Sequence, residues 1–147
     1  MRSMALLALL KTATINVMIP VVVGAAAFKG LGSIEDARLT ATTMVALSGT
    51  LIGFMMAALS MLVSAADRPF LQNLRRSGHF KNLIKEILTT ALLWLAVVVV
   101  ALAGHFVVGE YQRYVVAIAT ALLALSFVHF LMVGRKFKMV IEILSAN

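Results

Sequence analysis

Polar side chains are rare in the long apolar parts of this chain, so the few that occur there are the first candidates for chemistry. In the first apolar stretch, Thr12, Asn16 and Pro20 recur every four residues, with Lys11 beside them. That spacing places side chains on one face of a helix, and a proline removes a backbone hydrogen bond and bends the helix. The pattern predicts a pore-lining or gating element. The alternative is that Asn16 only holds neighbouring helices together.

Two histidines, His105 and His129, suggest a haem site, but helix geometry argues against it. At about 1.5 Å per residue, their depths along two successive helices differ by roughly 18 Å, so one iron cannot bind both. The chain has no cysteine, no glycine-rich phosphate loop and no serine with an evident base. We therefore expect no metal, no cofactor, no nucleic-acid partner and no enzymatic activity.

The composition indicates where these residues reside. Of the 147 residues, 62% are hydrophobic and only 13% are charged. Soluble domains are roughly 45–50% apolar and about 25% charged, and a soluble fold of this length could not bury so much apolar surface. The sequence therefore predicts an integral membrane protein, in which Lys11 can extend its amine to the headgroups.

Four apolar segments are long enough to cross a bilayer as helices. They are residues 5–28, 40–66, 87–108 and 114–134. Backbone polar groups cannot be left bare in lipid, so we expect an all-α, polytopic protein with a single membrane domain over residues 1–147. No Asp or Glu lies within the four segments, which argues against a proton- or cation-coupled carrier.

Most of the 13 Lys and Arg residues fall on one side of such a membrane domain. The positive-inside pattern then places both termini in the cytoplasm. The membrane is expected to be a bacterial inner membrane. An amphipathic elbow over residues 68–86 is expected to lie in the headgroup plane between the second and third crossings, with Gly78 breaking its helix. An amphipathic tail is expected over residues 135–147. The basic residues assigned to lipid or partner docking are Arg68, Arg75, Arg76, Lys81, Lys85, Arg135, Lys136 and Lys138.

Small residues at every fourth position allow helix backbones to approach closely in lipid. The second crossing carries Gly49, Gly53 and Ala57 at this spacing, and the fourth carries Ala117 and Ala121. These residues are predicted to pack helices within the chain or, alternatively, to form the interface of a homo-oligomer.

The elbow also carries a resemblance. Its pattern is Pro69-Phe70-Leu71, Leu74, Ser77-Gly78, Phe80 and Leu83-Ile84. In this pattern and in its helix count, the chain resembles small four-helix bacterial membrane proteins found in phage-defence and mobile-element contexts. With its closely spaced Met1 and Met4, it is also similar to phage holins, although holins usually have one to three crossings.

Two functions are compatible with these features. The first is a homo-oligomer that perturbs or permeabilises the membrane, as a defence effector or holin-like pore, with the Thr12–Asn16–Pro20 face along the pathway. The second is a membrane anchor or regulatory subunit. Its basic elbow and tail would dock anionic lipid headgroups or a cytoplasmic protein.

Overall fold

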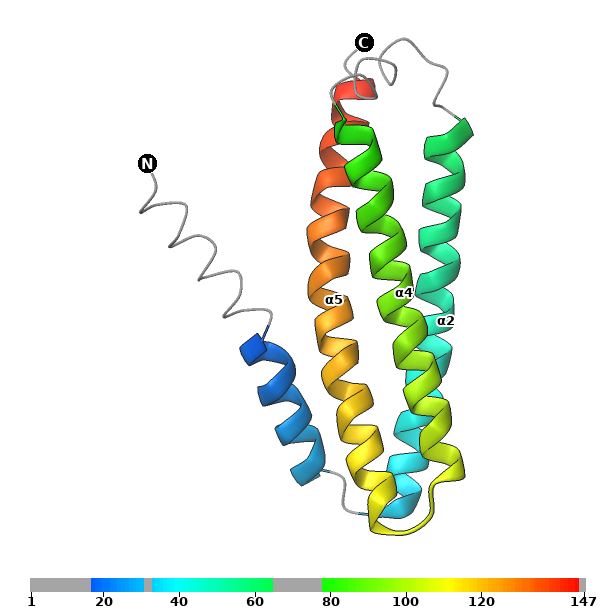
Figure 1. The fold of residues 1–147 in the computed structure, drawn as a ribbon, viewed down its shortest axis with the longest axis vertical. Helices are drawn as coiled ribbons and strands as arrows, with labels where there is room; N and C mark the ends of the chain where they lie inside the picture. Colours follow the sequence, from blue (N-terminus) through cyan, green and yellow to red (C-terminus); the bar gives the residue numbers. More distant parts are fainter. Residues whose placement is uncertain (1–16, 31–32, 65–77, 146–147) are drawn as a thin grey trace, which may run out of the picture.

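The computed structural model describes residues 17–30, 33–64 and 78–145, and nearly all of them are helical. A short helix, Val17–Gly30, is followed by three long ones: α2 (Ile34–Ser64), α4 (His79–Phe106) and α5 (Glu110–Ser145). Figure 1 shows α2, α4 and α5 side by side, with α4 antiparallel to the other two, and the short helix beside α5. The all-helical prediction is confirmed.

Local sequence signals explain where the long helices begin. At the start of α2, the Ser33 hydroxyl accepts a hydrogen bond from the Asp36 backbone N–H (3.1 Å), and the Asp36 carboxylate accepts one from the Ser33 N–H (3.0 Å). This reciprocal pair is a capping box. Gly78 precedes α4 with φ 77°, and Gly109 precedes α5 with φ 81°. Both backbones are left-handed, which favours glycine. The break predicted at Gly78 concerns an elbow helix that precedes it, and residues 68–77 lie outside the described residues.

The three long helices meet along a seam whose residues alternate in steps of three and four. This spacing, 3.5 residues on average, is that of coiled-coil packing. In α2 the buried and half-buried seam positions are Ala37, Ala41, Met44, Ser48, Leu51, Met55, Ala58 and Leu62. In α4 they are Phe80, Leu83, Ile87, Thr90, Trp94, Val97, Ala101 and Gly104, and in α5 Gln112, Val116, Ala119, Leu123, Ser126, Phe130, Val133 and Phe137. The core is therefore a three-helix seam along the whole length of the bundle.

The seam changes in side-chain size from one end to the other. Near the start of α2 it is built from small residues such as Ala37, Ala41 and Ala101. Towards the start of α4 it is built from larger ones such as Leu62, Phe80 and Ile87. Small side chains allow closer helix axes than large ones, so the bundle is expected to be wider at the Phe80 end.

Charged residues are confined to the two ends of the bundle. Residues 39–64 of α2, 87–106 of α4 and 114–134 of α5 contain no Asp, Glu, Lys or Arg. Each band of 20–26 residues is about 30–39 Å long, which matches the roughly 30 Å core of a bilayer. Within the described residues, three helices are long and apolar enough to cross a membrane, and Val17–Gly30 is a shorter apolar helix.

The second half of the predicted elbow differs from expectation. Residues 79–86 form the first two turns of α4, continuous with the apolar helix. The apolar side of the elbow is expected to face the membrane interior, but Phe80 and Leu83 on that side are buried in the bundle core. Over this part, the apolar side packs against neighbouring helices. The rest of the elbow, residues 68–77, lies outside the described residues. At the other terminus, α5 continues through Gly134 to Ser145.

Buried polar atoms without partners give the first testable prediction. Gln112 is fully buried, and among the described residues neither of its side-chain amide atoms has a hydrogen-bond partner. Replacing it with methionine, which is similar in volume and lacks the amide, should raise the free energy of unfolding by about 1–3 kcal/mol. Denaturation in mixed micelles measures this change.

Ser126 supplies the matched control for this prediction. It is equally buried, but its hydroxyl donates to the Leu122 carbonyl oxygen at 2.8 Å. Ser126→Ala should therefore give no comparable gain, because no unpaired group is removed. If Gln112→Met destabilises the protein instead, the amide has a partner in the folded state and the prediction is wrong.

Candidate binding surfaces

The polar face predicted on the first helix is only partly within the described residues. Lys11, Thr12 and Asn16 lie outside them. Pro20 is half-buried and lines a cleft between the short helix and α5, together with Gly24. In the described part of this helix, the face that carries Pro20 and Gly24, four residues apart, therefore points towards α5.

Two of the predicted packing residues, Ala117 and Ala121, meet a partner that sequence reasoning missed. A Cβ atom placed on Gly24 would lie 3.0 Å from the Ala121 Cβ and 3.3 Å from the Ala117 carbonyl oxygen. The two backbones approach closely because Gly24 has no side chain. Gly24 continues the Pro20 spacing by one more turn, and that signal could have identified it.

An aromatic contact extends the same helix pairing towards the end of the bundle. The rings of Phe28 and Tyr114 are 4.9 Å apart between centroids, and the Arg113 guanidinium lies 5.5 Å from the centre of the Phe28 ring. Such a cation–π contact is worth about 0.5–1 kcal/mol when exposed. The short helix is thus held on α5 by Gly24 in its middle and Phe28 near its end.

The small-residue ladder on α2 has no such partner in the described part of the chain. Gly49, Gly53 and Ala57 are exposed, and a Cβ placed on either glycine meets nothing within 4 Å. Packing of these positions within the chain is not seen among the described residues. They form an outward face of α2, which leaves the subunit-interface alternative open.

Basic residues from two helices gather at the end of the bundle where α4 begins and α5 ends. We call this the basic end; in the described residues it carries Lys81, Lys85, Arg135, Lys136 and Lys138. All five side chains are exposed. Two acidic residues accompany them: Glu86 pairs with Lys136, joining α4 to α5, and Glu142 lies 3.5 Å from Lys138. Arg68, Arg75 and Arg76, also predicted for docking, lie outside the described residues.

The opposite end of the bundle has a different balance of charge. Lys29, Arg38 and Arg113 are accompanied there by Glu35, Asp36 and Glu110. Among the described residues, basic and acidic residues at this end are equal in number, so the described part of this end has no net charge. The excess of positive charge among the described residues thus belongs to the basic end.

His105 and His129 both make hydrogen bonds within the bundle. His105 Nε2 lies 3.1 Å from the Thr42 hydroxyl, which links α4 to α2, and its Nδ1 lies 3.2 Å from the Ala101 carbonyl oxygen. His129 Nδ1 lies 3.1 Å from the Leu125 carbonyl oxygen on its own helix. Within the described ranges, no three His, Asp or Glu side chains are grouped to hold a metal ion.

Comparison with known proteins finds no matching family model, no matching curated protein and no matching solved structure.

Proposed function

We propose that this chain is a membrane-anchored docking subunit whose basic end binds a negatively charged partner. One observation carries the proposal: five exposed basic side chains, contributed by α4 and α5, lie at one end of a bundle whose charge-free middle is long enough to cross a bilayer. Surface charges of one sign steer an oppositely charged partner and favour its binding. The partner is an anionic headgroup layer or an acidic cytoplasmic protein.

The proposal includes an orientation. The excess of Lys and Arg at one end favours placing that end in the cytoplasm of a bacterial cell, by the positive-inside rule. The α2–α4 connection and the C-terminus would then face the cytoplasm.

Neutralising the basic end tests docking directly. The test variant is Lys81→Gln/Lys85→Gln/Arg135→Gln, which keeps the Glu86–Lys136 ion pair between α4 and α5. We expect protein captured by the detergent-solubilised chain to fall about tenfold, and capture by the unaltered chain to weaken with salt. The control is Lys29→Gln/Arg38→Gln at the opposite end, which should leave capture unchanged. Equal capture by all three proteins, with membrane insertion intact, would refute protein docking at this end.

A second candidate function has its own supporting observation. The outward Gly49–Gly53–Ala57 face of α2 fits close contact with another helix, and a second copy of the chain would supply one. We propose as the alternative a homo-oligomer that permeabilises the membrane, as a defence effector or holin-like pore. Its pathway would lie between subunits, because the three-helix core is filled by seam side chains.

Ion flux from reconstituted vesicles distinguishes the two functions. A permeabilising oligomer should leak at high protein density, and Gly49→Leu/Gly53→Leu should abolish the leak by keeping the backbones apart. Absence of flux from vesicles in which the protein is folded and oligomeric would count against this alternative.

A further inference from the structure

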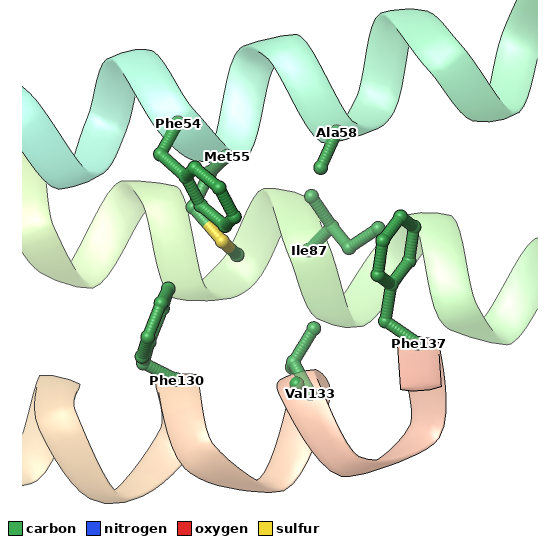
Figure 2. A pocket seen from close by; sticks show the side chains of 8 residues that line it. Phe54, Met55, Ala58, Ile87, Phe130, Val133 and Phe137 are labelled. Carbon is green, nitrogen blue, oxygen red and sulfur yellow. The ribbon is translucent and has the colours of Figure 1, made fainter. Parts of the chain in front are cut away.

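The basic-end half of the bundle contains a cavity between the three long helices. Its volume is about 40 Å³. Figure 2 shows Phe54 and Ala58 on one side, Ile87 behind them, and Phe130 and Phe137 on the facing helix. All of its lining residues are apolar, and a buried water needs two to four polar partners. The cavity therefore fits hydrocarbon rather than water.

The cavity opens between α2 and α5. Ile87 at its base is 1% exposed, whereas Phe54 at its edge is 58% exposed. On the α5 edge, Gly134 is exposed, and a Cβ placed there meets nothing within 4 Å. The helices α2 and α5 also pack less closely on each other than each does on α4. The result is an apolar groove that can be entered from the surrounding lipid.

A cationic side chain lies just beyond this groove, towards the membrane surface. Lys138 follows Gly134 by four residues, which puts it on the same side of α5, one turn or about 6 Å further along. Arg135 is the residue next to Gly134. Lys138 is 76% exposed at its side chain, with the exposed Glu142 carboxylate 3.5 Å away. Apolar groove and cation are thus stacked along the bundle axis.

We propose that this groove binds one acyl chain of an anionic phospholipid, with the phosphate held by Lys138 and Arg135. The order of groups along α5, hydrocarbon contact and then positive charge, matches the order of acyl chain and phosphate in such a lipid. The cavity takes a short stretch of the chain, and the rest lies against Phe54 and Gly134. This proposal rests on the proposed binding of a negatively charged partner at the basic end, and it identifies an anionic phospholipid as one such partner.

Native mass spectrometry of the detergent-purified chain tests the site. The probes are phosphatidylglycerol and phosphatidylcholine with identical acyl chains. The unaltered chain should retain one phosphatidylglycerol with about a fivefold preference over phosphatidylcholine. Gly134→Leu, which fills the groove, should lower retention of both lipids about tenfold. Lys138→Gln/Arg135→Gln should remove the preference and keep weak binding of both.

Gly30→Leu is the matched control, because a Cβ at Gly30 also meets nothing within 4 Å and Gly30 lies at the opposite end of the bundle from the groove. It should leave lipid retention unchanged. Ala58→Leu fills the groove from the α2 side and should repeat the effect of Gly134→Leu if that variant does not fold. Equal loss in Gly134→Leu and Gly30→Leu, or no preference in the unaltered chain, would overturn the proposal.

Lipid retention and the capture experiment on the charge variant together separate this site from the wider docking function. If filling the groove leaves lipid retention intact while the Lys81, Lys85 and Arg135 variant still loses its partner, docking stands and the acyl-chain site is refuted. If the groove variants lose lipid and the charge variant captures its partner normally, the lipid site stands and protein docking at the basic end is refuted.

Discussion

Trp94→Ala should lower the free energy of unfolding by about 2–4 kcal/mol, measured by denaturation in mixed micelles. Trp94 lies in the α4 part of the seam and is the largest of the fully buried side chains. Truncation leaves a large cavity, and the neighbouring side chains lose their van der Waals contacts. The loss is smaller than in a water-soluble core, because the separated helices also stay in detergent or lipid and no transfer from water is forfeited.

Leu92 gives the matched control for this truncation. It lies on the same helix, two residues away, and is 65% exposed. Leu92→Ala should change the free energy of unfolding by less than about 0.5 kcal/mol. Similar losses for both variants would mean that Trp94 is not packed in a protein core, and the three-helix seam would be wrong.

Gly24→Leu should separate the short helix from α5. The clash includes the Ala117 carbonyl oxygen, 3.3 Å from the added Cβ, and a backbone atom cannot move aside as a flexible side chain can. The chain has no native cysteine, so a Phe28→Cys/Tyr114→Cys pair supplies the only thiols. Cross-linking of this pair with a short bifunctional reagent should fall about tenfold when Gly24→Leu is added.

Gly30→Leu is the control for the clash, since a Cβ at Gly30 meets nothing within 4 Å. It should leave the cross-linking yield unchanged. If Gly24→Leu cross-links as well as the control, the short helix is not held on α5 through Gly24.

The helical class and the positions of the apolar helices could be predicted because charges bracket them. Arg38, Glu86, Arg113 and Arg135 mark the limits of long uncharged stretches, and only a helix satisfies its own backbone in lipid. The predicted ranges are those of the membrane crossings, and the helices extend beyond them. For example, α4 begins at His79, eight residues before the predicted crossing, because packing against the neighbouring helices continues beyond the apolar stretch.

The three-helix seam could not be predicted from hydrophobicity. In a soluble bundle, apolar seam residues contrast with polar outer ones. Here the outward face is apolar too, as the exposed Leu92 and Val99 show, and the seam contains Ser48, Thr90 and Gln112. The usual contrast between an apolar seam and a polar outer face is therefore absent, and at the polar seam positions it is reversed.

The candidate sites were predictable to different degrees. The basic end follows from the order of charges along the chain, since α4 begins where α5 ends. The contact of Gly24 with Ala117 and Ala121 depends on which helix the first one packs against, and the groove beside Gly134 depends on how far α2 and α5 lie apart. These are properties of the assembled bundle.

The central claim is that the charge-free middle of the bundle spans a membrane and that the basic end lies in the cytoplasm. Cysteine labelling in intact bacterial cells tests this claim most directly. Single-cysteine variants at Arg135 and Lys85 should react with a membrane-impermeant maleimide only after the cells are opened. A cysteine at Lys29 or Arg38 should react in intact cells. Labelling of Arg135→Cys from outside, or recovery of the protein in solution without detergent, would contradict the claim.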